Sequence, residues 1–226
     1  MIVFSPSNMD TFRKCPRRFQ GQSITKDIKY KPSAKKDNGI AVHNELEKLV
    51  NAETLPEVFK LPDTVDMGYV RQRLMGFHRM RNHGMEVFTE HELAINNKYQ
   101  KTGWWDDDCI LRAKADLLLV GFGGAVIVDW KTGRKWDTDA FQLRVESLLV
   151  HLLYGIQKVN IEYDYVEQGE TVYDVIDFTS GIGHVQDIVE LMKTMRESIS
   201  ANVFPATPNK FCKWCDYYKT EKCNVC

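Results

Sequence analysis

The pattern of apolar and polar positions changes part-way along the chain and divides it into a helical part and a sheet-forming part. Residues 40–50 and 61–84 carry apolar side chains at helical spacing, so each is predicted to form a helix. The first is expected to open after Gly39 and the second to end near Gly84. The polar, lysine-rich residues 25–39 are predicted to form a loop.

The second part of the chain is dominated by strand patterns. Residues 86–95, 108–121 and 125–131 are apolar runs with strand-like alternation, and a Gly-Phe-Gly-Gly turn precedes the third. Residues 159–177 are predicted to form a hairpin that turns near Gly169.

Two further helices are predicted around these strands. Residues 137–155 begin with Asp137 and Asp139, present an apolar face and stop at Gly155. Residues 183–202 form the second, and a cysteine-rich tail follows it. This order of elements favours an α/β fold with a mixed central sheet flanked by helices.

One domain can accommodate all 226 residues. We expect a mainly helical part (1–84), a sheet core (85–180) and a final helix with a cysteine-rich tail (181–226). No apolar stretch approaches the roughly 20 residues of a membrane span, and MIVFSPSNMD does not resemble a signal peptide, so a cytoplasmic location is expected. The formal net charge of −1 leaves room for a local basic groove that binds nucleic acid.

Charged side chains stand at the ends of two apolar strands. Asp129 and Lys131 follow the run AVIV and, being two residues apart, share one face of the strand. Asp116 lies in the preceding strand, and neighbouring strands are about 4.8 Å apart, so the two carboxylates can share a divalent ion. His43 could add a nitrogen ligand, which suits Mn²⁺ alongside Mg²⁺. The alternative is a structural salt bridge between Asp129 and Lys131.

Four motifs, GIAVH, KADLLLV, IVDWK and FQLRVE, occur in the order typical of the RecB-like branch of the PD-(D/E)XK nuclease superfamily, which the chain resembles. The resemblance implies a restriction-endonuclease-like core and a deoxyribonuclease that depends on Mg²⁺ or Mn²⁺. It also implies that His43, Asp116 and Asp129 bind the metal and that Lys131 is the catalytic lysine.

The helix after the D-x-K strand departs from the family pattern at one position. The resemblance places Gln142 on a helix that contacts DNA and braces the site, but Glu146 stands where the family has a tyrosine. The family often carries another acid in an earlier strand, where Glu90 fits better than Glu92. The alternative is that these two glutamates lie on a solvated strand face.

Four of the six cysteines, Cys212, Cys215, Cys223 and Cys226, crowd the end of the sequence. In a reducing cytosol such clustering favours metal binding over disulfides. A zinc site made by the tail alone is one alternative. Cys109 stands apart and is predicted to be a buried thiol.

The opening SPSNMDTFRKCPRRF resembles the cysteine-bearing stretch of iron–sulfur nucleases in the same branch, among them the AddB nuclease domain and the CRISPR-associated RecB-like exonucleases. The resemblance implies a 4Fe–4S cluster held by Cys15, Cys212, Cys215 and Cys223, with Cys226 able to replace Cys223. This cluster would act as a clasp between the N- and C-terminal segments. The alternative is that Cys15 is a small buried residue, with zinc or no metal in the tail.

Aromatic and basic side chains near the predicted site bear on the substrate. Trp104, Trp105 and Trp136 flank the site strands, and exposed indoles would stack on unpaired bases, although packing into the core is the alternative. Arg17 and Arg18 could line a path for phosphates.

These features together predict a metal-dependent DNA exonuclease that prefers single-stranded ends. The resemblance implies a role in recombination, repair, phage replication or CRISPR spacer acquisition, with recombination or adaptation proteins as partners. The rival hypothesis is a catalytically inactive DNA-binding or assembly module with a metal-stabilised tail.

Overall fold

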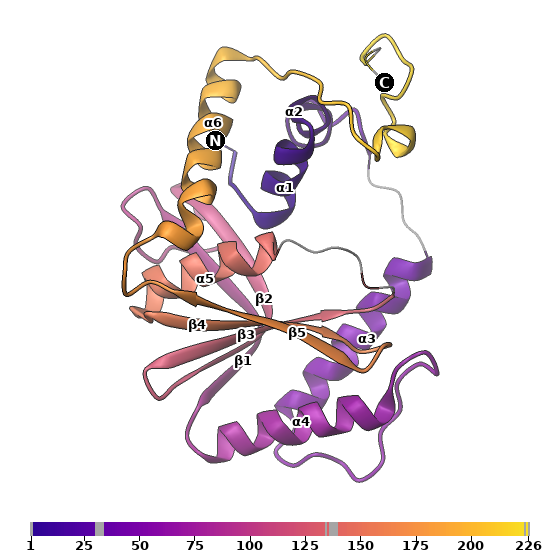
Figure 1. Ribbon diagram of the computed structural model, residues 1–226, viewed down its shortest axis with the longest axis vertical. Coiled ribbons are helices and arrows are strands. Elements are labelled where there is room, and N and C mark those ends of the chain that lie inside the picture. The colour runs from indigo at the N-terminus through magenta and orange to yellow at the C-terminus, as the bar shows by residue number, and fades with distance from the viewer. Residues whose placement is uncertain (1, 30–33, 134, 136–139, 224, 226) are drawn as a thin grey trace.

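A mixed sheet lies at the centre of the molecule, with helices on both of its faces (Figure 1). The computed structural model describes residues 2–29, 34–133, 135, 140–223 and 225. The strands follow one another across the sheet in chain order: β1 (Glu86–Asn96), β2 (Cys109–Gly121), β3 (Gly124–Lys131), β4 (Lys158–Tyr165) and β5 (Glu170–Asp177). β3 and β4 run parallel and the other neighbours antiparallel, which confirms the predicted mixed sheet.

Helices flank the sheet in the described part of the chain. They are α1 (Pro6–Lys14), α2 (Pro16–Phe19), α3 (Ala34–Asn51), α4 (Met67–Asn82), α5 (Phe141–Tyr154) and α6 (Gln186–Ala201). Short turns complete them: the π-helical η1 (Gln20–Ile24) and the 3-10 turns η2 (Gly183–Val185) and η3 (Cys212–Trp214). Among the described helices, none combines the length and the apolar composition that crossing a membrane requires.

Each face of the sheet has its own hydrophobic core. The first core lies between the sheet and α1, α5 and α6, and it includes Leu149 and Met195. The second lies between the sheet and α3 and α4, and it includes Leu46 and Phe77. Strands can supply both cores because successive side chains point to opposite faces. Each fully buried side chain of this size contributes about 1.5–3 kcal/mol.

The N-terminal helices α1 and α2 are separated by a break at Cys15. Ser5 caps α1: its hydroxyl accepts from the Asn8 N–H at 3.4 Å, and the Asn8 side chain accepts from the Ser5 N–H at 2.9 Å. Pro16 disfavours a helical conformation in the residue before it. Cys15 is therefore extended (φ −165°, ψ 106°), and α2 begins at Pro16. The break leaves the Cys15 side chain at a bend between two helices.

The prediction that residues 25–39 form a loop is wrong for their last part. Residues 34–39 belong to α3, so Gly39 lies inside this helix and does not precede it. A Cβ atom added to Gly39 would stand 3.0 Å from Thr132 Oγ1. The glycine therefore allows α3 to pass close to the end of β3, a tertiary requirement that the local pattern does not reveal.

The predicted start of the next helix is also wrong, since residues 61–66 are not helical. Asp66 accepts a hydrogen bond from the Tyr69 N–H at 2.9 Å and caps α4. The capping aspartate sets the start of the helix, although the apolar residues before it also have helical spacing. The start expected for α5 at Asp137 and Asp139 lies outside the described residues.

The N- and C-terminal segments lie side by side in the upper part of Figure 1. The Arg17 N–H donates to the Pro205 carbonyl at 3.2 Å, and the Asn209 side-chain amide donates to the Lys14 carbonyl at 3.1 Å. Tyr217 packs against Gly21, where an added Cβ would stand 2.6–2.8 Å from the phenol ring. The tail therefore docks directly on the α1–α2–η1 segment.

This close approach predicts that Gly21→Ala weakens the docking of the tail. The methyl group would displace the Tyr217 ring, and overpacking of this kind costs about 1–3 kcal/mol of unfolding free energy. Gly76→Ala is the matched control, because a Cβ at Gly76 in α4 meets nothing within 4 Å. That variant should gain about 0.5–1 kcal/mol from helix propensity. Denaturant unfolding measures both, and equal stabilities of the two variants would contradict the expectation.

Candidate active site

The candidate site lies where β2 and β3 stop pairing. Their ladder runs from Gly121↔Gly124 to Leu117↔Val128. Asp116 and Asp129 are the next residues beyond its end, so their carboxylates stand on neighbouring strands at the opening. The two strand acids that the sequence singled out therefore stand on neighbouring strands. Among the described residues, the group of ligand atoms that lie within 4.8 Å of one another includes Asp116 but not Asp129.

The peptide groups of Trp130 hold His43 and Asp116 in place. The Trp130 N–H donates to Asp116 Oδ2 at 3.0 Å, and the Trp130 carbonyl accepts from His43 Nε2 at 2.8 Å. Because the carbonyl can only accept, Nε2 carries a proton, and Nδ1 is left as the basic nitrogen of the neutral ring. The side chain of Trp130 is buried in the second core and fixes this backbone.

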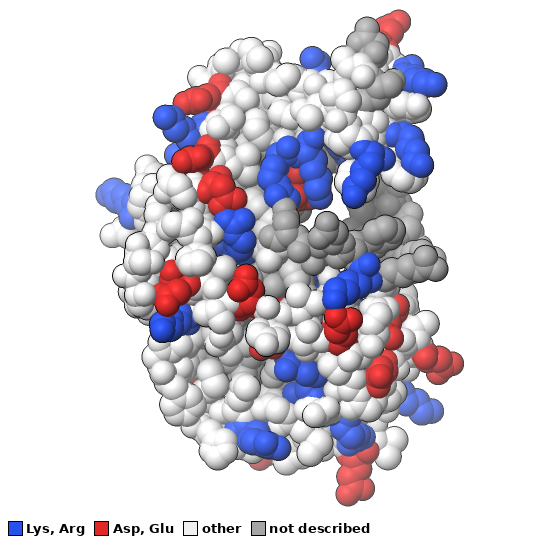
Figure 2. Space-filling model, in the orientation of Figure 1, with Lys and Arg blue, Asp and Glu red and all other residues white. Residues whose placement is uncertain are grey.

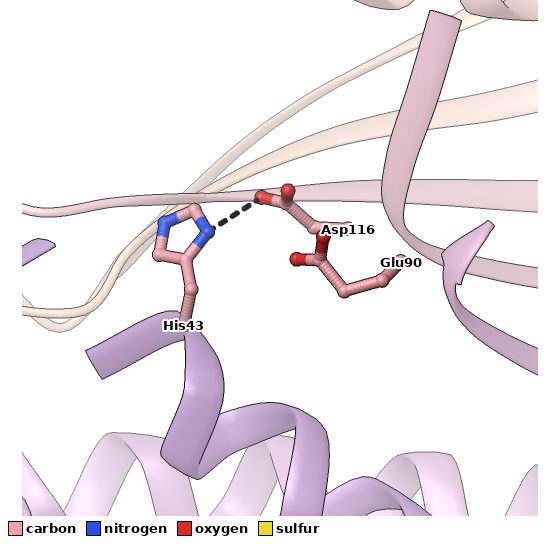
Figure 3. A group of neighbouring side chains, drawn as sticks. All are labelled: His43, Glu90 and Asp116. Carbon is pink, nitrogen blue, oxygen red and sulfur yellow. Dashed lines mark ion pairs between the residues drawn. The ribbon is translucent and has the colours of Figure 1, made fainter. Parts of the chain in front are cut away.

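His43 Nδ1 faces Asp116 Oδ2 at 3.3 Å (Figure 3). In the neutral ring two lone pairs would face each other, so this geometry suits a proton or a cation between the two groups. Burial opposes protonation of His43, but the hydrogen bond and charge of Asp116 outweigh it and raise the pKa of His43. A bound metal ion would take the place of this proton.

Glu90 joins the same pair through an unusual backbone conformation. One carboxylate oxygen of Glu90 lies within 4.8 Å of ligand atoms of both His43 and Asp116 (Figure 3). Thr89 accepts a hydrogen bond from Asn51 of α3, whereas His91 contacts Tyr154 of α5 on the opposite face.

A regular strand would alternate its faces at every residue, yet Glu90 follows Thr89 to the α3 face. Its positive φ of 46° provides the turn. A non-glycine residue in this conformation costs about 1–3 kcal/mol, and such strain is typical of functional sites. The sequence analysis identified Glu90 only as a possible further acid of the site. No local sequence pattern predicts its positive φ.

Asp129 and Lys131 form an ion pair beside this group. Lys131 Nζ lies 2.5 Å from Asp129 Oδ2, although this oxygen accepts no hydrogen bond of good geometry from the described residues. Asp129 is only 3% exposed. Burial raises its pKa to about 6, Lys131 opposes the shift and Asp116 adds to it. Asp129 is therefore a desolvated carboxylate whose charged form is favoured by the Lys131 ammonium.

Glu146 is a further buried acid that faces the site from α5. It is 1% exposed, and its Oε1 accepts from the Gln142 amide at 3.0 Å. Its Oε2 has no hydrogen-bond partner among the described residues. Burial first, and then the charge of Asp129, raise the pKa of Glu146 well above its ordinary value. The family's tyrosine position thus holds a carboxyl that favours its protonated form.

The donor set fits a divalent cation. One imidazole nitrogen and the carboxylates of Glu90 and Asp116 converge, and hard oxygen ligands with a single nitrogen suit Mg²⁺ or Mn²⁺. The carboxylate of Asp129, whose Oδ2 pairs with Lys131, lies beside this group. Glu90 also forms an ion pair with Lys114 at 2.7 Å.

A groove of about 950 Å³ leads away from this centre. Lys131, Gln142 and Glu146 line one part of it, and α1 lines another. The cationic side chains along it are Arg13, Lys14, Arg112, Lys114, Lys131 and Lys210. Figure 2 shows lysine and arginine gathered over the part of the molecule where Figure 1 places α1, α2 and the tail. Despite a net charge of −1, this groove is locally basic.

Of the flanking tryptophans, Trp104 lines the groove and Trp105 is 82% exposed, whereas Trp136 lies outside the described residues. Trp104 and Trp105 therefore do not belong to either core.

The candidate cluster ligands line a second, smaller cavity. Cys15, Cys212, Cys215 and Cys223 all border it, and Cys226 lies outside the described residues. The Thr207 N–H points at Cys15 Sγ at 3.5 Å, and the Asn209 N–H at Cys212 Sγ at 3.3 Å. Such backbone donors can stabilise thiolate sulfur, which suits a thiolate-bound group at Cys15. Cys212 is disulfide-bonded in this structure, so it could bind such a group only after that bond is reduced.

Arg17 and Arg18 border this cysteine cavity and not the groove. Their Nε atoms are buried without a hydrogen-bond partner among the described residues. Cys109 lies elsewhere and is 1% exposed, as predicted for a buried thiol.

Comparison with known proteins agrees with this geometry. The family model of the PD-(D/E)XK nuclease superfamily matches residues 3–220. The chain belongs to this superfamily. No curated protein matches the chain. Among solved structures, the crystal structure of SSO0001 is similar, with a TM-score of 0.45 and 13% sequence identity over 95% of this chain and 83% of that chain. Membership of the superfamily implies a metal-dependent nuclease.

The burial of Glu146 predicts a pH-dependent stability. A carboxyl whose folded-state pKa is raised stabilises the fold below its unfolded pKa, and this contribution is lost as pH rises through the folded value. In EDTA, Glu146→Gln should match the wild type near pH 5 and be more stable by about 1–3 kcal/mol near pH 8. Denaturant unfolding across this range measures the difference. Parallel stability curves for the two proteins would show that Glu146 is not a buried titrating acid.

Proposed function

We propose that the protein is a deoxyribonuclease that uses Mg²⁺ or Mn²⁺ and digests DNA from single-stranded ends. The convergence of His43, Glu90 and Asp116 within 4.8 Å, beside the Asp129–Lys131 pair, carries this proposal. The family match adds the expectation that such a centre hydrolyses phosphodiester bonds.

His43 Nδ1, Glu90 and Asp116 would hold the cation, with Asp129 as a further ligand. When bound, a divalent cation polarises the phosphate and lowers the pKa of the attacking water. The Trp130 peptide groups keep the imidazole and the Asp116 carboxylate oriented, as outer hydrogen bonds do in metal sites. Lys131, an ammonium beside Asp129, would offset the negative charge that builds on the phosphate in the transition state.

The basic groove supports a nucleic-acid substrate. Its cations are those that phosphate contacts require, and it includes Lys131 itself. Attack from a free end, and a setting in the cytoplasm in recombination, repair, phage replication or CRISPR spacer acquisition, follow from the resemblance to RecB-like exonucleases.

We also propose that a 4Fe–4S cluster occupies the cysteine cavity, held by Cys15, Cys212, Cys215 and Cys223. Four thiolates suffice for such a cluster. Its support is the shared cavity and the backbone N–H groups directed at Cys15 and Cys212. Such a cluster would close the chain over almost two hundred residues and stabilise the docked tail. Zinc in the same cavity is the alternative.

The rival function is a DNA-binding module without catalysis. Glu146 is the feature that favours it, because a buried carboxyl stands where the family pattern has a tyrosine. Nuclease activity decides between the two.

Hydrolysis of end-labelled single- and double-stranded DNA by anaerobically purified protein tests the enzyme. With Mg²⁺ or Mn²⁺ the wild type should release short products from the ends of single strands, and EDTA should stop the reaction. Asp129→Ala and Lys131→Ala should lower the rate at least roughly a hundredfold, because each removes a charge that acts in the transition state. Glu197→Gln, on an exposed part of α6, is the control and should keep full activity. An intact fold with no metal-dependent cleavage would refute the nuclease and favour the binding module.

Iron analysis tests the cluster separately. The anaerobic wild type should contain about four iron atoms with matching sulfide per chain. Cys15→Ala should lose most of this iron, whereas Cys109→Ala should keep it because Cys109 does not border the cavity. Stoichiometric zinc in place of iron would contradict the cluster.

A further inference from the structure

The loop between β1 and β2 presents two tryptophans on a rigid frame. The Thr102 hydroxyl donates to Asp108 Oδ1 at 2.6 Å, and the Gly103 N–H donates to Asp106 Oδ2 at 2.7 Å. The Asn96 amide also donates to Asp108, at 3.1 Å. The loop is therefore held in shape by its own hydrogen bonds, although Trp105 is left 82% exposed.

Arg112 joins the two indoles into one surface. Its guanidinium lies 4.6 Å from the ring centroid of Trp104 and 4.8 Å from that of Trp105, and it donates to the Trp104 carbonyl at 2.5 Å. Cation–π contacts of this kind order both rings. The platform, defined as Trp104, Trp105 and Arg112, is thus built before any ligand arrives, which lowers the entropy cost of binding.

The platform is continuous with the candidate active site. Trp104 and Arg112 line the same groove as Lys131. Arg112 and Asp116 are four residues apart on β2, which corresponds to about 13 Å along the strand. Roughly four stacked nucleotides cover this distance at about 3.4 Å per nucleotide. One short single strand of DNA can therefore contact both the platform and the metal ligands.

We propose that the Trp104–Arg112–Trp105 platform stacks the unpaired bases of a DNA strand and so selects single-stranded DNA for the groove. An exposed indole can accept any base by its face, but only where the base has left the duplex. Lys114 lies between the platform and Asp116 on β2, and with Arg112 it provides the positive charge that phosphates need. This inference rests on the proposed function, because it names the form of DNA that reaches the same site.

Binding of a fluorescein-labelled 12-nucleotide DNA strand and of its duplex, measured by anisotropy in EDTA, tests the platform without hydrolysis. Trp105→Ala should weaken single-strand binding roughly tenfold or more and leave duplex binding unchanged. Trp214→Ala is the matched control, because Trp214 is 64% exposed beside Lys213 but does not line the groove. That variant should bind like the wild type.

Tryptophan fluorescence gives a second measurement of binding at the platform. The single strand should quench the tryptophan fluorescence of the wild type, and Trp105→Ala should reduce this quenching while Trp214→Ala should not. If Trp105→Ala fails to fold, the wild type still provides a test, because the absence of quenching by the single strand would contradict the platform.

Equal single-strand binding by both variants, or an equal loss for single strand and duplex, would overturn the platform. Loss of metal-dependent cleavage in the hydrolysis experiment is a separate result. A protein that binds single strands through Trp105 and never cleaves them would retain the platform and refute the nuclease.

Discussion

The candidate site depends on one stretch of backbone at Trp130. Its N–H orients a carboxylate from β2, and its carbonyl orients an imidazole from α3. Its neighbours Asp129 and Lys131 project together from the same strand end. Because the indole of Trp130 is locked in the second core, the position of the site is coupled to the packing of α3 on the sheet. The D-x-K motif thus contributes through its middle residue as well as through its two charges.

Buried acids give this region a stability cost that a cation can offset. Asp129 and Glu146 are each almost completely buried, and each has an oxygen without a hydrogen bond from the described residues. Desolvation raises the pKa of both groups, and their charges oppose each other. A divalent ion would reverse the balance, since it favours the charged forms that burial disfavours. Metal binding and folding are therefore expected to be coupled here.

The surroundings of the site come from segments far apart in the chain. The docked tail contributes Lys210 and Phe211 to the groove, while α1 contributes Arg13 and Lys14. Contacts such as that between Tyr217 and Gly21 hold the two segments together. The cysteine cavity lies at this junction, so a metal group in it would stabilise a wall of the groove as well as the join between the chain ends.

The sequence by itself determined the order of strands and helices, because burial imposes periodicities that local stretches display. The strand ends singled out Asp116, Asp129 and Lys131, and the resemblance to the nuclease family implied their roles and that of His43. The tertiary structure decided the backbone conformation of Glu90 and the place of Gly39, which no local sequence pattern predicts. The left-handed backbone at Glu90 turns its carboxylate to the α3 face, and Gly39 lies within a helix at a place where a Cβ atom would crowd Thr132. These features arise from strand pairing and helix packing between residues far apart in sequence, and such contacts exist only once the fold has formed.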